Sequence, residues 1–156
     1  MRIKKMVSVL FASMLLLTMT QPAIAADVST NVVGIGDTRD NALTLISNQP
    51  YDLFIANASD VDWYKWTNNS GKDRWILLDL RSNGGQTSLD LAAQIKYTET
   101  RESTLLYAEP TKPGSEFPAI IRNLYVPQGA TLYVRASANK FVTQEQYRLN
   151  FIMYDV

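Results

Sequence analysis

The sequence predicts an all-β fold, an antiparallel β-sandwich of eight to nine strands in a jelly-roll-like arrangement. Three observations predict it. Short segments of alternating apolar and polar residues recur at intervals of about ten residues, and turn-forming Gly, Pro, Asn and Ser separate them. No segment after the first 25 residues shows sustained helical spacing of apolar residues. An eight-stranded closed barrel is the alternative topology, because strand spacing alone does not distinguish it from a sandwich.

The first 25 residues have the three parts of a secretory signal peptide. They begin with basic residues at Arg2, Lys4 and Lys5, continue with a mostly apolar segment at 7–19, and end in the small-residue cleavage signal Ala23-Ile24-Ala25. The apolar segment is shorter than the roughly 18 residues that indicate a membrane span, and no comparable segment follows. We therefore expect a secreted protein, extracellular or periplasmic after cleavage near Ala25, with no membrane span.

The remaining chain is long enough for one domain. Removing 25 residues from 156 leaves 131, a length at which a domain buries roughly two thirds of the surface that its unfolded chain exposes. Residues 26–41 are polar and are expected to form a lead-in arm with one short strand at 31–35. Residues 42–156 are expected to form the β-sandwich domain.

Short apolar segments at 42–46 and 51–56, on either side of the polar turn 47–50, are the first strands expected in the domain. Residues 74–82 carry apolar side chains on both faces, which is typical of a central strand. Residues 88–98 alternate regularly. A slip of one residue would turn their apolar face to solvent, so the register should be firmly set.

The stretch at 58–67 is the most distinctive of the chain, because two carboxylates one residue apart lead directly into an aromatic strand. Side chains alternate faces along a strand, so Asp62, Tyr64 and Trp66 share one face while Trp63 lies on the other. Two large aromatic side chains on one face predict that this face packs inward. Trp63 is then left to cover a sheet edge or to form part of an exposed binding surface.

The second half of the domain begins with a loop and ends with three strands. Three prolines between 100 and 118 exclude a helix and a central strand, so we expect a long surface loop with an edge strand at 105–108. Residues 119–126, 131–138 and 147–153 follow as alternating strands.

The composition excludes several classes of function. Removing the three basic residues of the signal peptide leaves twelve basic and fifteen acidic residues, a net charge of −3, whereas nucleic-acid and anionic-membrane binders need a basic surface. The chain has no cysteine, so no disulfide holds the exported fold. It has no histidine either, and therefore lacks the commonest general base and transition-metal ligand.

Catalysis is not expected from the remaining polar residues. The carboxylates Asp79, Asp90 and Glu109 lie on separate segments, and they are interpreted as part of the solvated face of the strands. Glycoside cleavage would need two carboxyl groups held roughly 5 to 9.5 Å apart. The sequence therefore predicts a non-catalytic protein.

Four motifs between residues 37 and 153 carry a resemblance to a known family. They are Ile55–Trp66 with its Asp-x-Asp-aromatic core, Leu89–Leu91, Val126–Gly129 followed by Tyr133–Arg135, and Tyr147–Leu149. On these motifs the chain resembles the bacterial pre-peptidase C-terminal (PPC) domain, a β-sandwich module related to the collagen-binding domains of clostridial collagenases. The resemblance implies a non-catalytic accessory domain that aids localisation, substrate adhesion or stability. Any enzyme that it serves is expected to be a separate polypeptide.

The resemblance also implies a metal. Some members of this family bind calcium through residues of the lead-in arm and through the carboxylates before the aromatic strand. Asp60 and Asp62 match the second group, and Asp40, with Asp37 and Asn41 beside it, lies at the location of the first. The implied calcium ligands are therefore Asp60, Asp62 and Asp40, although the usual Glu-Pro-Asn start of the arm is absent. The alternative is that the two aspartates before the strand only bond turn amides.

The sequence thus predicts a secreted binding module that holds an extracellular polymer or a secreted protein partner. The residues expected to form its aromatic surface are Trp63, Trp75 and Tyr133. Collagen-binding relatives carry paired tyrosines where this chain has Ala130-Thr131-Leu132 before Tyr133, so the resemblance supports collagen binding less than it supports calcium binding. The alternative is a structural or interaction protein, a chaperone-like or inhibitory partner of a separately encoded secreted protease.

Overall fold

The structure, a computed structural model, describes residues 35–115 and 117–155. In these residues the chain forms ten β-strands and no helix, so the predicted all-β class is confirmed. The expected signal peptide, most of the expected arm and all but the last residue of the strand expected at 31–35 lie outside the described residues. No helix long and apolar enough to cross a membrane occurs in the described part of the chain. The strands are β1 (Leu43–Thr44), β2 (Tyr51–Ile55), β3 (Val61–Thr67), β4 (Arg74–Ser82), β5 (Ser88–Thr98), β6 (Arg101–Glu102), β7 (Leu106–Tyr107), β8 (Ala119–Val126), β9 (Thr131–Lys140) and β10 (Glu145–Asp155).

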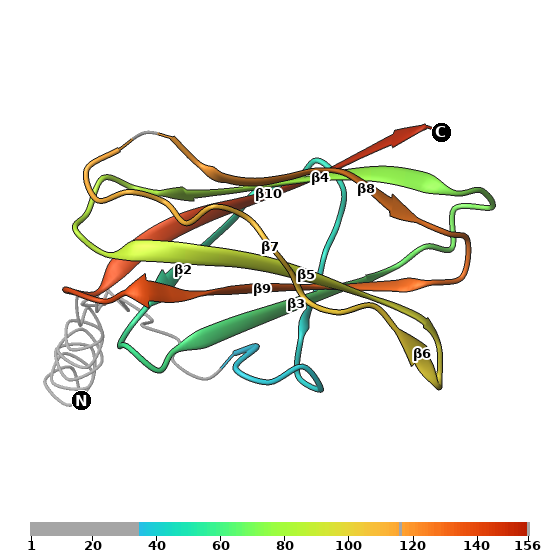
Figure 1. The fold of residues 1–156 in the computed structure, drawn as a ribbon, viewed down its shortest axis with the longest axis horizontal. Helices are drawn as coiled ribbons and strands as arrows, with labels where there is room; N and C mark the ends of the chain where they lie inside the picture. The colour runs from blue at the N-terminus through green and yellow to red at the C-terminus, as the bar shows by residue number, and fades with distance from the viewer. Residues whose placement is uncertain (1–34, 116, 156) are drawn as a thin grey trace, which may run out of the picture. The chain divides into compact units, whose positions relative to one another are not determined.

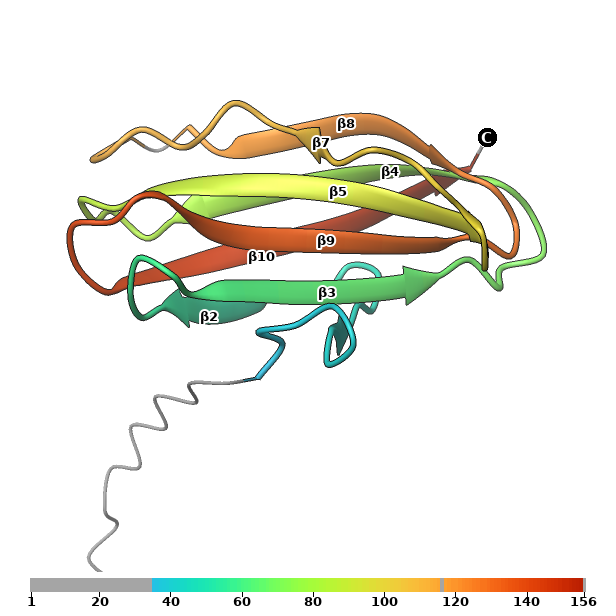
Figure 2. The same ribbon diagram turned by 60° about the horizontal axis from the view of Figure 1, so that its bottom comes forward.

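The strands form two sheets that pack face to face (Figure 1). Sheet A has the order β1-β3-β9-β5-β6, with β7 also paired to β5, and sheet B has the order β2-β10-β4-β8. All pairings are antiparallel except the two-residue pairing of β1 with β3, which is parallel. Figure 2 shows β3, β9 and β5 of sheet A in front of β10 and β4 of sheet B. The predicted antiparallel sandwich is therefore confirmed.

Successive long strands alternate between the two sheets. The chain passes from β2 in sheet B to β3 in sheet A, back to β4 and on to β5, and the same alternation runs from β7 to β10. The resulting orders, β2-β10-β4-β8 and β3-β9-β5-β7, are those of an eight-stranded jelly roll. The sheets remain separate in the described residues, as in a sandwich and not a closed barrel. The short strands β1 and β6 bring the number of strands to ten, slightly above the predicted eight to nine.

The inner faces of the long strands supply the core, as the alternation predicts. On β3, Asp62 and Tyr64 are buried and Trp66 packs against the core. The largest fully buried side chains are Tyr64, Tyr147, Phe151, Ile55, Ile76, Leu78, Leu80, Leu89, Leu91, Leu132, Leu149 and Val126. Because both sheets contribute to this layer, every outward-facing side chain of a long strand lies on one of two separate surfaces.

Strands β4, β5 and β8 have the predicted bounds, whereas other strands differ at their ends. Strand β1 is shorter than the predicted 42–46. The Tyr51 hydroxyl accepts from the Ile46 amide (2.7 Å) and donates to the Thr44 carbonyl (3.0 Å), which a longer strand would use itself. Asn48 then turns the chain with a positive φ of 61°. Strand β9 is longer than predicted because its pairing with β5 continues to Lys140.

Candidate functional site

Three carboxylates gather where the lead-in arm meets the start of β3. Asp37 from the arm, Asp60 from the β2–β3 turn and Asp62 from β3 each place one oxygen within 4.8 Å of the others. The Trp63 amide donates to the Gly36 carbonyl (2.7 Å), and this bond holds the arm beside β3. We call Asp37, Asp60 and Asp62 the acidic cluster.

The acidic cluster contains two of the three predicted metal ligands. The third, Asp40, is exposed and does not belong to the group, and its place is taken by Asp37. The chain turns after Gly36, where the Asn41 amide donates to the Thr38 carbonyl (3.1 Å), and Asp40 lies within this turn. Of the arm residues named from the sequence, Asp37 lies next to Asp60 and Asp62, and Asp40 does not belong to this group.

The two carboxylates next to β3 are held by different donors. Oδ2 of Asp60 accepts the Ala56 amide (2.6 Å), as expected for an aspartate in a turn. Oδ2 of Asp62 accepts the Tyr147 hydroxyl (2.6 Å), and the Tyr147 and Tyr64 oxygens are also 2.6 Å apart. Because Tyr147 has one hydroxyl hydrogen and donates it to the carboxylate, Tyr64 is the donor in the second bond. A buried chain of two hydroxyls thus ends on Asp62.

Burial is the main cause of the shifted pKa of Asp62, the buried member of the acidic cluster. It raises the pKa of Asp62 to about 6; the hydrogen bond from Tyr147 opposes this change, and the charges of Asp60 and Asp37 add to it. Burial also raises the pKa of Tyr147 well above its ordinary value. Near neutral pH the cluster therefore holds a buried negative charge that no cation of the described residues pairs within 4 Å.

The donor set of the acidic cluster fits a hard divalent cation. Carboxylate oxygens are the ligands that calcium prefers, and each of Asp60 and Asp62 uses only one of its two oxygens in the hydrogen bonds described above. Bidentate carboxylates, backbone carbonyls and water can supply the rest of the 6 to 8 oxygens that calcium typically takes. A bound cation would also lower the electrostatic cost of ionising Asp62.

Two of the three residues predicted to form an aromatic surface lie together. Trp63 on β3 and Tyr133 on β9 are half-buried and point to the outer face of sheet A, next to Arg135 and Lys65, their respective cross-strand partners. The Arg39 guanidinium lies 3.9 Å from the centre of the Tyr133 ring, so the arm partly covers this face.

Trp75 lies apart from these two residues, on the outer face of sheet B. Its strand neighbour Ile76 is fully buried between the sheets, so Trp75 points the opposite way. The sequence predicts one aromatic surface from Trp63, Trp75 and Tyr133. The structure divides them, because β4 belongs to one sheet while β3 and β9 belong to the other.

Trp75 has two aromatic neighbours that the sequence did not single out. Tyr125 on β8 and Tyr154 on β10 are its cross-strand partners, so the three side chains form a row across three strands. The Trp75 and Tyr125 rings are 5.3 Å apart with an edge-to-face angle of 63°. Tyr125 is 40% exposed and Tyr154 49%. We call Trp75, Tyr125 and Tyr154 the aromatic row.

The sequence contains little that would place Tyr125 and Tyr154 next to Trp75. The alternation of Ala119–Val126 predicts that Tyr125 lies on the face of the strand opposite to that of the core residues Leu124 and Val126. It does not predict which strand lies beside Tyr125. Tyr154 lies one residue beyond the strand end predicted at 153. Cross-strand register, which makes the row, is set by the whole sheet and is not visible in any one strand.

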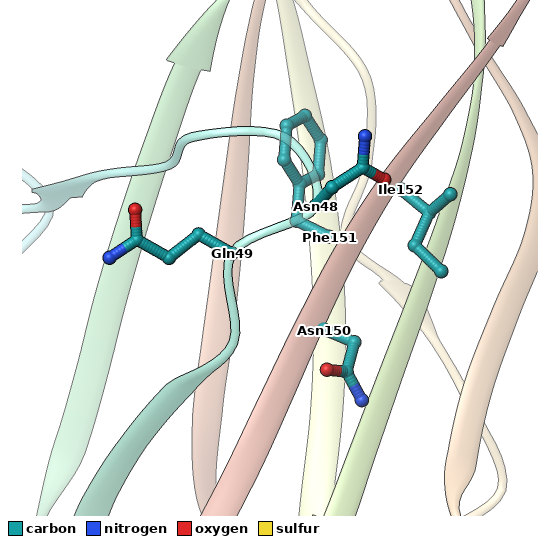
Figure 3. Close-up of a pocket in the computed structure, with 5 residues that line it drawn as sticks. All are labelled: Asn48, Gln49, Asn150, Phe151 and Ile152. Atoms are coloured by element: carbon teal, nitrogen blue, oxygen red, sulfur yellow. The ribbon is translucent and has the colours of Figure 1, made fainter.

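A shallow pocket of about 180 Å³ lies where the turn between β1 and β2 meets β10 (Figure 3). It is lined by residues of the turn and of β10: Asn48, Gln49, Asn150, Phe151 and Ile152. The Asn48 amide donates to the Phe151 carbonyl (3.0 Å), which holds the turn against β10. Ile152 precedes Tyr154 by two residues and so points to the same face. The outer face of sheet B thus changes from aromatic to amide-bearing along β10.

Ser137 and Lys140 form a Ser-x-x-Lys sequence, a spacing found in some serine hydrolases. Those enzymes place the two residues on a helix, where positions three apart share a face, whereas β9 is a strand. Ser137 is buried and Lys140 is exposed. This spacing therefore does not bring the hydroxyl to the amine here.

Comparison with known proteins adds no family assignment: no protein-family model and no curated protein matches this chain. The resemblance to PPC domains rests on the four sequence motifs and stays a prediction.

Proposed function

We propose that this protein is a secreted, non-catalytic binding module that holds a polymer or a secreted protein partner through the aromatic row on sheet B. One observation carries the proposal: Trp75, Tyr125 and Tyr154 lie side by side on an outward face, and the two tyrosines are 40% and 49% exposed. Exposed aromatic side chains grouped on one face are typical of binding surfaces, because they bury large areas at a small entropic cost.

The aromatic row is held in place before any ligand arrives. The Tyr125 hydroxyl donates to the Asp73 carboxylate, which also accepts the Gln128 amide (2.8 Å). At the other end of the row, Arg74 and Lys72 both pair with Asp155, the residue after Tyr154. Fixed aromatic side chains lose little further freedom on binding, which favours affinity.

The face also offers polar groups for an extended ligand. Beyond the row, Asn150 and Asp79 are cross-strand partners, and Arg81 donates to both Asp79 oxygens (2.8 Å each). From Trp75 to Arg81 a strand rises roughly 20 Å at about 3.3 Å per residue. A polymer lying along β4 would therefore meet aromatic rings first and hydrogen-bonding side chains next. The resemblance to PPC domains, as modules for substrate adhesion, supports the same function.

A second function, as an inhibitory or chaperone-like partner of a separate secreted protease, is favoured by one other feature. Phe117 is 82% exposed and borders a pocket of about 270 Å³ with Glu109, Pro110, Lys112 and Pro118. A protruding aromatic side chain on a proline-rich loop suits insertion into the substrate cleft of another protein. For this function, binding of the protease would depend on Phe117 and would not depend on the aromatic row.

Replacing Trp75 by Ala is expected to weaken binding about 10- to 100-fold, since a central aromatic contact is often worth roughly 2 kcal/mol or more. The measurement is co-sedimentation with insoluble cellulose, chitin and collagen fibres, together with capture of partners from culture medium. Phe54→Ala is the matched control, because Phe54 is 42% exposed on β2 of the same sheet and lies outside the row. Equal binding by wild type and Trp75→Ala would contradict the proposal, and loss of a captured peptidase on Phe117→Ala alone would favour the second function.

We further propose that calcium binds at the acidic cluster. Adding calcium at about 100 times its dissociation constant is expected to raise the free energy of unfolding by about 2.7 kcal/mol, seen as an increase of several degrees in Tm. Asp60→Asn should abolish the increase, and Asp40→Asn, which alters an exposed aspartate outside the cluster, should preserve it. Thermal unfolding with calcium and then with chelator measures both. A calcium effect that Asp40→Asn abolishes and Asp60→Asn preserves would contradict the assignment.

A further inference from the structure

We propose a second binding site, on the outer face of sheet A, for a polysaccharide that carries carboxylate groups. It is built from two cationic and two aromatic side chains, arranged so that each cation lies opposite an aromatic ring. Trp63 and Lys65 lie on β3, and Arg135 and Tyr133 lie directly opposite them on β9. Facing residues of an antiparallel pair lie roughly 4.5 to 5.5 Å apart at Cβ, so each cationic side chain adjoins an aromatic one. We call these four residues the cation–aromatic block.

The two cations of the block are unpaired. Among the described residues neither Lys65 nor Arg135 has an ion-pair partner within 4 Å. Other cations near this face are neutralised: Arg39 donates to both oxygens of Glu102 (2.9 and 2.6 Å), and Lys96 donates to Glu99 (2.7 Å). The block therefore holds two cations that no carboxylate of the described residues pairs within 4 Å, on a protein whose net charge is expected to be negative.

Arg135 is only weakly held by the protein. Its single hydrogen bond in the described structure is a long one, 3.4 Å from Nη2 to the Tyr107 hydroxyl. Its Nε–H is buried and has no acceptor, an uncommon condition for a buried donor. Burial raises the pKa of the nearby Asp90 carboxyl, and the charge of Arg135 only partly opposes this change, because the two side chains form no ion pair within 4 Å. The Nη groups can therefore take an external acceptor without losing a strong internal bond, whereas the buried Nε–H cannot reach one.

Arg135 also lies between two aromatic side chains in one row across sheet A. The register runs from Trp63 to Arg135, then to Ala92 on β5, and then to Tyr107 on β7. Ala92 is too small to obstruct the row, and the guanidinium lies 5.5 Å from the centre of the Tyr107 ring. Tyr107 is 57% exposed. A planar cation is thus flanked on both sides by rings.

This chemistry identifies the ligand class. A guanidinium binds a carboxylate through two parallel hydrogen bonds, an ammonium adds a point charge, and aromatic rings bury the apolar faces of sugar rings. A uronic-acid polymer presents a carboxylate and a sugar ring in each unit. Nucleic acid would need a longer basic stripe than two unpaired cations.

Binding of polygalacturonate, compared with its methyl-esterified form, tests the inference. The two polymers share their sugar rings and differ in charge, and we expect at least tenfold tighter binding of the charged one at low salt, decreasing as salt rises. Lys65→Gln and Arg135→Gln should each weaken that binding about threefold and together about tenfold. Arg122→Gln removes the same charge as Arg135→Gln from an exposed position on β8, in the other sheet, and should leave the binding of polygalacturonate unchanged.

Two results would overturn the proposal: equal binding of the two polymers, or charge-dependent binding that the double variant retains. Tighter binding of a single-stranded oligonucleotide than of polygalacturonate would also overturn it, in favour of nucleic acid. Circular dichroism of each variant shows whether it folds, and Lys65→Gln, which alters no ion pair or hydrogen bond described above, keeps the test informative if Arg135→Gln does not. The outcome is independent of the aromatic row, because that row lies on the other sheet.

Discussion

Asp62→Asn is expected to raise the free energy of unfolding by about 2 to 3 kcal/mol at pH 8 in calcium-free buffer. Burial raises the pKa of the Asp62 carboxyl to about 6, so at pH 8 the folded protein holds a buried negative charge. Asparagine removes that charge, and its amide oxygen can still accept the Tyr147 hydroxyl that now bonds Asp62. Neutralising a site that the fold makes unfavourable for charge should therefore stabilise the protein.

The size of this stabilisation should depend on pH. The Asp62 carboxyl has a pKa of 3.8 without the influence of the fold and about 6 within it, so the folded state binds the proton more tightly. Its contribution to stability is complete below about pH 4 and is lost as the pH rises through about 6. The difference between Asp62→Asn and wild type should accordingly be small at pH 4 and full above pH 7.

Urea unfolding at pH 4, 6 and 8 measures this difference. Asp52, Asp73 and Asp155 have a lowered pKa because of hydrogen bonds from Arg148, Tyr125 and Lys72 respectively, so their contributions are lost as the pH falls. They are the same in both proteins and cancel in the comparison. Asp40→Asn should lie within about 0.5 kcal/mol of wild type at each pH, as an exposed substitution. An Asp62→Asn protein less stable than wild type at pH 8 would show that the buried charge is compensated.

Phe151→Ala is expected to lower the free energy of unfolding by about 3 to 5 kcal/mol. Phe151 is fully buried on the inner face of β10, and its ring centre lies 5.3 Å from that of Trp66 on the opposite sheet. Its cross-strand partner Leu78 is also fully buried. The other core side chains hold the sheets apart, so the cavity left by the ring cannot close, and its contacts with both sheets are lost.

Phe54→Ala is the control for this substitution, because it deletes the same atoms from a side chain that is 42% exposed on β2. It should cost no more than about 1 kcal/mol, since the exposed ring makes fewer contacts. Urea unfolding followed by circular dichroism compares the two variants. Comparable losses for Phe151→Ala and Phe54→Ala would contradict the assignment of Phe151 to the layer between the sheets.

Much of the fold was predictable because burial imposes a period of two on each strand. The alternation at 88–98 places Leu89, Leu91, Ala93, Ile95 and Tyr97 on the inner face; the first four are buried, and Tyr97 is partly buried against the core. The two-sided apolar pattern at 74–82 predicted a central strand, and β4 lies between β10 and β8. Short strands such as β6 were missed, since two residues carry no periodicity and pair only because β5 extends beside them.

The candidate sites were predictable only in part, because each combines residues from distant parts of the chain. Asp60 and Asp62 were recognisable together in one stretch, whereas Asp37 joins them through the contact of the arm with β3. The three aromatic residues predicted as one surface belong to two sheets, and the partners of Trp75 became visible only with the register of β8 and β10. The local sequence predicts which face of its strand a side chain occupies, but not which residues of the neighbouring strands lie beside it.

The sequence by itself determined the all-β class, the faces of the long strands and the two carboxylates at the start of β3. The tertiary structure alone decided which strands are neighbours, and with them the aromatic row, the cation–aromatic block and the acidic cluster. The physical reason is that alternation reflects the burial of each strand separately, a local property. Pairing, by contrast, depends on hydrogen bonds and packing between segments up to a hundred residues apart, as in the pairing of β2 with β10.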